Sequence, residues 1–445
     1  MNLEPFCWIA ATWAACATAA YPPDSPQRTS EVPIPPMKQI LLALLLQLSL
    51  VSPAWADEPF APAVSYGQQR TLPSQILGEE RRLSIALPRS YSAGGGTRYP
   101  VLYLLDAEFN HFFATFSAMA AQMATDATPS VPEMIVVGIH SQRRVRDSTP
   151  TDSRKDLRGI DNASFAGSGG ADRFLDFVRE ELIPFIGREY RTDDYRLLFG
   201  YSLTGLPVLQ SLMSQPDLFN AYVLADPSLW WDERLMQRRL LAGEYRRPSK
   251  PLRFFIATTQ ELPSGLPPEH FNRDFIAAFE RQPIPGVSLG SKIYGAHEDH
   301  GSLSVPSFYD GLRFVFADYK LPAWTKVPSA TELEAHFARA SERLGGTMRP
   351  REDLLNWLGY EKLRSHAIEP PSVPAAIALL ELNTRYYPQS PNTWDSLGEA
   401  LEAAGDTPRA EAAYRRALEL APDYPSARAG LQRLQAAAPR ANRSN

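Results

Sequence analysis

Arg196-Leu-Leu-Phe-Gly-Tyr-Ser-Leu-Thr-Gly-Leu-Pro-Val-Leu-Gln210 runs from a short apolar segment through a serine between glycines into a pattern with helical spacing. A strand that ends in a sharp turn at a serine and continues at once into a helix is typical of a nucleophile elbow. The motif G-x-S-x-G is imperfect here, because Thr204 replaces its last glycine and Gly205 follows. Ser202 is therefore either a nucleophile or a turn serine that caps the helix.

Short apolar segments alternate with amphipathic ones on both sides of this stretch. The apolar runs are nearly continuous, as in strands buried on both faces of a sheet. They are residues 101–105, 134–138, 196–199, 221–224 and 252–257. Helical patterns at 171–187 and 205–214 lie between them. The order strand, helix, strand predicts an α/β fold with a largely parallel sheet.

The strand signals stop near residue 320, and helices rich in Ala, Leu, Glu and Arg follow. A spacing of 34 residues pairs Tyr360 with Trp394, Leu363 with Leu397, Ala376 with Ala410, and Pro388 with Pro422. This is the tetratricopeptide period, and it predicts a small all-α unit of helical repeats. With only about two copies, this unit needs a further surface to pack against. We expect the unit to dock on the α/β domain or on a second subunit, with residues 426–436 as its cap.

A targeting segment begins at Met37. Residues 37–56 have a basic start, an apolar run and the end Ala-Trp-Ala, which together predict a secretory signal peptide cleaved after Ala56. We therefore expect a chain exported to the periplasm or secreted, with no membrane span in its mature form. Residues 1–36 would be an upstream extension that is not translated, or else a disordered one. Both cysteines, Cys7 and Cys16, lie there, so the mature chain would have none.

Composition and pattern together set the partners and the domain limits. The net charge of −5 gives no basic field for a phosphate backbone, so nucleic acid is not an expected partner. The domains are expected in the following order: a signal peptide at 37–56, an α/β domain at 57–320, a linker at 321–349, repeats at 350–437 and a disordered tail at 438–445.

A serine nucleophile needs a base, and residues 293–302 supply candidates. This segment follows the last expected strand and precedes a helix at 307–319. His297 and His300 compete, and the loop-tip position of His300 favours it. The spacing in His297-Glu-Asp-His300 lacks the helix and the third ligand of a zinc protease, so we expect no metal, and the chemistry requires no cofactor.

The orienting acid is the least determined member of the site. Glu261 follows the expected strand 252–257 and would complete the order Ser, acid, His, so it is our first choice. Asp226 follows the preceding strand and is the alternative, with capping of a turn before Pro227 as its simpler role. A serine-histidine dyad without an acid is the third reading.

Six segments in the same order resemble the esterase branch of the α/β-hydrolases, which includes esterase D-like enzymes, siderophore esterases, feruloyl esterases and mycolyltransferases. The segments are 99–106, 137–139 with 144–151, 195–202, 226–231, 272–273, and 298–302 with 309–313. The resemblance spans about 64–322 and implies an α/β-hydrolase fold with Ser202 and His300 as the catalytic pair. It also implies oxyanion amides from Leu203 and from Ala107 or Glu108.

Further residues are candidate substrate contacts, each with a simpler alternative. The candidates are Tyr201, Trp230, Trp231 and Arg144. The tryptophans could instead be core residues, and Arg144 could belong to an ion-pair network. The sequence departs from the family at Thr204 and at Asp226, where many relatives carry serine.

The expected function is hydrolysis of a small-molecule carboxylic ester, such as a siderophore, aromatic or sugar ester, through an acyl-enzyme. One alternative is acyl transfer through the same intermediate. The other is a non-catalytic exported protein whose repeats bind a protein partner or a second copy of the chain.

Overall fold

The computed structural model describes residues 65–92, 96–125, 129–260, 270–323, 325–365 and 367–437. The expected signal peptide, the segment before it, the C-terminal tail and Glu261 lie outside these residues. Among the described helices, none combines the length and the apolar character needed to cross a bilayer.

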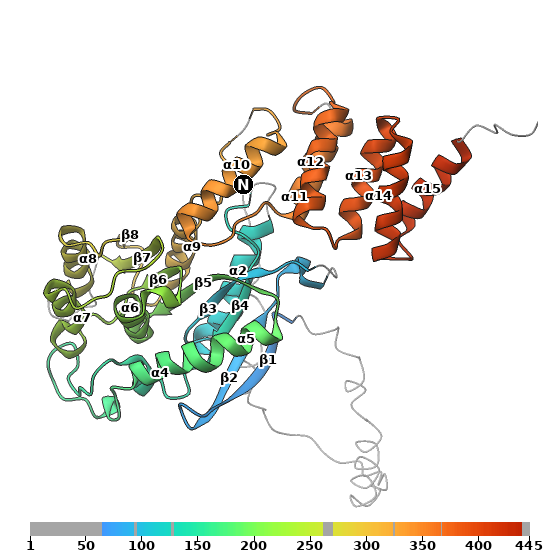
Figure 1. Cartoon of the computed structure of the whole chain (residues 1–445). Helices are drawn as coiled ribbons and strands as arrows, with labels where there is room; N and C mark the ends of the chain where they lie inside the picture. Colours follow the sequence, from blue (N-terminus) through green and yellow to red (C-terminus); the bar gives the residue numbers. More distant parts are fainter. Residues whose placement is uncertain are drawn as a thin grey trace, which may run out of the picture. The chain divides into compact units, whose positions relative to one another are not determined.

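Eight strands form one sheet in the order β1-β2-β4-β3-β5-β6-β7-β8 (Figure 1). They are β1 (Gln68–Ser74), β2 (Glu79–Ala86), β3 (Tyr99–Leu104), β4 (Ile135–Ile139), β5 (Thr192–Tyr201), β6 (Ala221–Ala225), β7 (Leu252–Thr259) and β8 (Val287–Tyr294). The strands from β4 to β8 run parallel, and only the edge pairs β1 with β2 and β2 with β4 are antiparallel. The predicted α/β fold with a mostly parallel sheet is confirmed.

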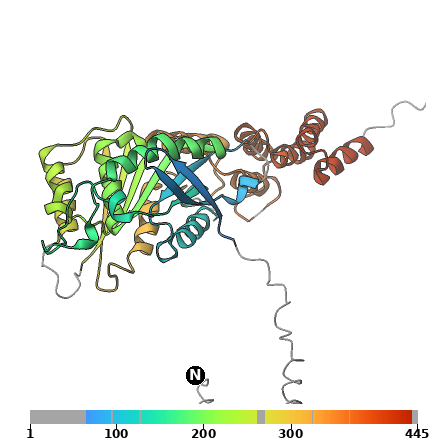
Figure 2. The same cartoon turned by 90° about the horizontal axis from the view of Figure 1, so that it is seen from below.

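Helices cover both faces of the sheet, and Figure 2 shows the green helices α4 and α5 on the opposite side from the teal helix α2. The first face carries α4 (Ala171–Phe177), α5 (Ile183–Glu189), α6 (Gly205–Ser214), α7 (Trp231–Ala242) and α8 (Phe271–Arg281). The second face carries α2 (Phe112–Thr125) and α9 (Ser304–Val315). The short helix α3 (Arg144–Ser148) follows β4. Both faces of the central strands are therefore buried, which explains their continuous apolar sequences.

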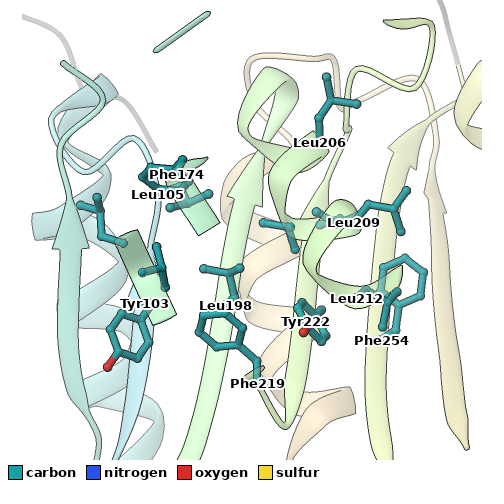
Figure 3. Close-up of a cluster of buried hydrophobic side chains, with 14 of the residues drawn as sticks. Tyr103, Leu105, Phe174, Leu198, Leu206, Leu209, Leu212, Phe219, Tyr222 and Phe254 are labelled. Carbon is teal, nitrogen blue, oxygen red and sulfur yellow. The ribbon is translucent and has the colours of Figure 1, made fainter. Parts of the chain in front are cut away.

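The core under α6 holds strand β5 in place (Figure 3). Leu206, Leu209 and Leu212 recur at helical spacing on one side of α6 and are fully buried. They pack over side chains of neighbouring strands, including Leu198 of β5 and Tyr222 of β6. Burying each such leucine contributes roughly 1.5–3 kcal/mol. The strand and the helix on either side of Ser202 are thus held together by a closely packed apolar core.

In the described part of the chain, six helices follow α9. They are α10 (Ala330–Leu344), α11 (Glu352–Arg364), α12 (Val373–Tyr386), α13 (Pro391–Ala403), α14 (Thr407–Leu420) and α15 (Pro425–Ala437). Helix α10 lies in the segment expected to be a linker. It begins with a capping box between Ser329 and Glu332, and it buries Leu333 and Phe337. The hydrophobic core of the α2 and α9 face continues through α10 into α11 and α12, so the repeats dock on the α/β domain.

The first repeat differs in register from the pairing expected at 34 residues. Gly359 of α11 packs against Leu380, and Gly398 of α13 packs against Tyr414, so these two glycines are equivalent. The loop from 365 to 372 is five residues longer than the loop from 404 to 406. The spacing of 34 therefore holds for the second helices of the two repeats, while the pairings of Tyr360 with Trp394 and of Leu363 with Leu397 were wrong.

Candidate active site

The sharp turn expected at Ser202 forms at the carboxyl end of β5. Ser202 has left-handed backbone with φ of 56°, which is uncommon for a residue other than glycine. A Cβ on Gly200 would lie 2.5 Å from the carbonyl oxygen of Thr204, and one on Gly205 would lie 2.6 Å from the Cβ of Pro227. Both glycines are thus required by close approach. Although Thr204 interrupts the motif, Gly205 still allows the turn to approach the segment at Pro227 closely.

His300 is the histidine that meets this serine. Its Nε2 lies 3.1 Å from the Oγ of Ser202, within hydrogen-bond distance. The ring stacks on Tyr201, with centroids 5.0 Å apart, and the Tyr201 hydroxyl donates to the His300 carbonyl at 2.6 Å. Burial raises the pKa of Tyr201 to about 12, so the hydroxyl stays a donor near neutral pH. Tyr201, expected to bind substrate, thus contacts and positions the histidine loop.

The carboxylate that reaches His300 is Asp226, at the end of β6. Its Oδ2 lies 2.7 Å from the Nδ1 of His300. Its Oδ1 accepts from the Thr258 hydroxyl at 2.6 Å and from the Asn272 side-chain amide at 2.8 Å. Asp226 also has left-handed backbone, with φ of 44°. Of the two acids named from the sequence, Asp226 has the geometry of an orienting acid, while Glu261 lies outside the described residues.

The two expected sources of oxyanion amides are not equivalent. Leu203 follows Ser202 directly, as expected for the first amide. In the other loop, the Ala107 amide already donates to the Ile139 carbonyl at 3.2 Å. Ala107 is therefore not available, and Glu108 is the candidate for the second amide. The Glu108 carboxylate accepts from the Ser141 amide at 2.9 Å, which holds this loop against the end of β4.

The remaining candidates have mainly structural contacts. Trp231 is fully buried, and its indole donates to the Thr151 hydroxyl at 3.2 Å, so it is a core residue. Trp230 is half-buried and packs on Phe165 and Trp231. Arg144 makes a two-pronged hydrogen-bond contact with the carboxylate of Asp106, with its Nη2 at 2.8 Å. Arg144 therefore belongs to an ion pair, which is the simpler of its two predicted roles.

Sequence reasoning missed the residues that hold this candidate site in place. Thr258 and Asn272 hold Asp226, and Thr204 contacts Asp106. Asn272 lies in one of the family-like segments, but nothing in the sequence assigned it to the acid. Within the described ranges, no group of three or more His, Cys, Asp or Glu side chains is arranged to hold a metal ion.

Comparison with protein families finds two matches. Residues 74–256 match a family described as "Putative esterase", and residues 391–434 match a tetratricopeptide repeat. The first match runs from the end of β1 into β7 and includes Ser202 and Asp226. The second covers helices α13 and α14 and most of α15.

The chain is also similar to individual esterases and to a hydrolase of known structure. The ferri-bacillibactin esterase BesA of Bacillus subtilis is 34% identical over 40% of this chain, and the chain spans 65% of that protein. The siderophore enterobactin esterase of Emericella nidulans is 28% identical over 59% of this chain and 97% of its own length. The crystal structure of an IroE-like serine hydrolase from Shewanella oneidensis superposes with a TM-score of 0.62 at 29% identity, covering 72% of this chain and 99% of that one.

Proposed function

We propose that this chain, whose residues 74–256 belong to the esterase family that they match, hydrolyses carboxylic esters through an acyl-enzyme on Ser202. One observation carries the proposal: Ser202, His300 and Asp226 form a continuous hydrogen-bonded line, with distances of 3.1 and 2.7 Å. These three groups come from different loops at the same edge of the sheet, and their contacts match the nucleophile, base and acid of a serine hydrolase.

The mechanism follows from the donors and acceptors. Asp226 accepts a hydrogen bond from the Nδ1–H group of His300, which leaves Nε2 unprotonated as the acceptor for the Ser202 proton. The Ser202 oxygen then attacks the ester carbonyl, and the amides of Leu203 and Glu108 stabilise the oxyanion. Protonated His300 returns its proton to the departing alcohol. Water repeats the sequence and releases the acid, since the His300 side chain is 46% exposed.

For the substrate, we propose the ester bonds of a siderophore. The two curated relatives described above are siderophore esterases by name, and one of them aligns over almost its full length. Pocket shape decides among esters more than the catalytic residues do, so aromatic and sugar esters are the competing substrates.

The test compares wild type with Ser202→Ala on p-nitrophenyl butyrate and on enterobactin, with fluorophosphonate labelling of both proteins. We expect wild type to cleave both esters and to label, and Ser202→Ala to lose at least about 10⁴-fold in kcat and all labelling. Turnover of the aryl ester alone would keep the esterase activity and reject the siderophore. Wild type without turnover or label would overturn the proposal.

Hydrolysis and acyl transfer differ only in the acceptor that meets the acyl-enzyme. We propose water as the acceptor, because the exposed His300 lies open to solvent. Mass spectrometry of the products with and without a sugar alcohol checks this. An ester of the added alcohol as the main product would identify a transferase.

Export and partner binding are part of the proposal as well. The signal-like residues 37–56 support export, and sequencing the N-terminus of protein recovered from the periplasm or the medium should give Asp57 as the first residue. We also propose that the repeats bind a protein or a second copy of the chain, because stacked helical repeats form extended binding surfaces. Sedimentation of the purified chain would separate a dimer from a monomer that awaits another partner.

A further inference from the structure

Thr204, the residue that breaks the elbow motif, connects the two segments that carry the candidate oxyanion amides. Its Oγ1 lies 3.1 Å from the Oδ2 of Asp106. Thr204 directly follows Leu203, and Asp106 stands two residues before Glu108. The Thr204 hydroxyl thus joins the backbone beside one amide to the backbone beside the other. Both side chains are almost fully buried, so little water competes for this contact.

The hydroxyl of Thr204 is fully engaged inside the turn. It accepts from the Tyr201 amide at 3.1 Å, and its single proton lies between the Tyr201 carbonyl at 2.8 Å and the Asp106 carboxylate. A carboxylate is the stronger acceptor of the two. A hydroxyl at this position therefore accepts a hydrogen bond within the turn and also contacts a carboxylate outside it. Glycine, the usual residue at this position of the motif, has no side chain that could do either.

Asp106 is a buried charge that needs these partners. It is 1% exposed and has left-handed backbone, with φ of 54°. Arg144 donates to both of its oxygens, at 3.0 Å and 3.1 Å from Nε, and Thr204 is a further donor. The backbone turn that starts at Asp106 closes when the Phe109 amide donates to the Asp106 carbonyl at 2.9 Å. This turn contains Glu108, so the position of Asp106 sets the position of that amide.

We propose that the Thr204 hydroxyl is a positioning element for catalysis, which sets the distance between the Leu203 and Glu108 amides by holding Asp106. The inference rests on the proposed function, because it concerns the oxyanion of the same acyl transfer. Two amides stabilise an oxyanion only when both lie about 2.7–3.1 Å from it. A misplacement of about 1 Å in such a site costs about 100-fold in rate.

The experiment compares Thr204→Val, which keeps the shape and removes the hydroxyl, with Thr204→Ser, which keeps the hydroxyl. We expect Thr204→Val to lower kcat on p-nitrophenyl butyrate by about 10- to 100-fold, with KM changed less than about threefold. Thr204→Ser should stay within about threefold of wild type. Affinity for a trifluoromethyl ketone, which forms a tetrahedral oxyanion on Ser202, should fall in parallel with kcat/KM. A purely structural role would move the unfolding temperature without this parallel loss.

Thr204→Ala provides a second variant without the hydroxyl, in case the valine methyl beside a buried carboxylate prevents folding. Folded Thr204→Val or Thr204→Ala with wild-type kcat and inhibitor affinity would overturn the inference, while labelling of wild type at Ser202 would leave the proposed function standing. Wild type without turnover or labelling would reject the proposed function, and this inference with it.

Discussion

The carboxyl edge of the sheet and the helical repeats both contain residues with left-handed backbone, but they use different amino acids for it. At the edge, Asp106, Ser202 and Asp226 follow the neighbouring strands β3, β5 and β6, with φ between 44° and 56°. In the helices after the sheet, the described residues with positive φ are glycines: Gly345 follows α10, and Gly405 follows α13.

This difference shows where a side chain is kept although its left-handed backbone is strained. Glycine adopts left-handed backbone without steric penalty and is the usual residue after a helix. An aspartate or a serine in the same conformation costs on the order of 1–3 kcal/mol, which persists only where the surroundings hold it. At each of the three strand ends, the side chain makes a contact on which the candidate site depends. Asp106 contacts Thr204, Ser202 contacts Nε2 of His300, and Asp226 contacts Nδ1 of the same ring.

Removing the charge of Asp226 tests the edge most strongly. Asp226→Asn keeps the size of the side chain but no longer fixes the His300 tautomer that leaves Nε2 as the acceptor. We expect kcat on p-nitrophenyl butyrate to fall by about 10³–10⁴-fold, as in serine proteases whose acid is changed in this way. The thermal unfolding midpoint should change by less than about 2 °C, because Thr258 and Asn272 remain as partners.

Glu261→Gln is the matched control, since Glu261 is the other acid named from the sequence. We expect it to keep kcat within about twofold of wild type. A large loss in Glu261→Gln together with an active Asp226→Asn would reverse the assignment of the acid. Equal activity in both variants would favour a serine-histidine dyad.

The comparison itself can be tested with a mirrored pair of substitutions. Ser202→Gly should be more stable than Ser202→Ala by about 1 kcal/mol, because glycine relieves the left-handed backbone, and both should be inactive. Gly405→Ala should lose about 1 kcal/mol, since no atom within 4 Å of the new Cβ adds a clash and only the backbone is strained. Chemical unfolding measures both. Equal stability of the two Ser202 variants would contradict the interpretation of the edge as strained.

Much of the fold could be predicted because its signals are local. The apolar runs of the central strands follow from burial on both faces, and the strand, turn and helix around Ser202 are continuous in sequence. The register of the first repeat was lost because its connecting loop is longer by five residues, a change that a fixed period cannot show. Helix α10 was taken for part of a linker because the prolines around it outweighed its own pattern.

The acid and the second oxyanion amide depend on tertiary contacts instead. Glu261 and Asp226 both follow strands, and sequence alone does not show which strand end turns its carboxylate toward His300. The left-handed backbone of Asp226, held by Thr258 and Asn272, brings its carboxylate to the histidine. The choice between Ala107 and Glu108 depended on a hydrogen bond to Ile139 of the neighbouring strand β4, which sequence spacing does not reveal.

The smallest expected effect lies at the other end of β5, at Asp193. Burial raises the pKa of this carboxyl to about 7, and the charge of Asp194 adds to the shift. The folded chain therefore keeps a proton that the unfolded chain loses above about pH 4, so this group makes stability fall as the pH rises from about 4 to 7. Ser202 lies nine residues further along the strand, roughly 30 Å away, so activity should not follow this titration.

Asp193→Asn removes the titration and keeps an acceptor for the Tyr195 amide, which donates to Asp193 at 2.9 Å. Relative to wild type, we expect the variant to gain about 1 kcal/mol between pH 4 and pH 8, less than the full shift implies because solvent reaches part of the side chain. Chemical unfolding at several pH values measures this difference. Asp194→Asn, at the exposed neighbouring residue, is the control, and its stability difference from wild type should depend less on pH. A pH-independent difference would place Asp193 among ordinary surface carboxylates, and a change in kcat/KM would mean that the two ends of β5 are coupled.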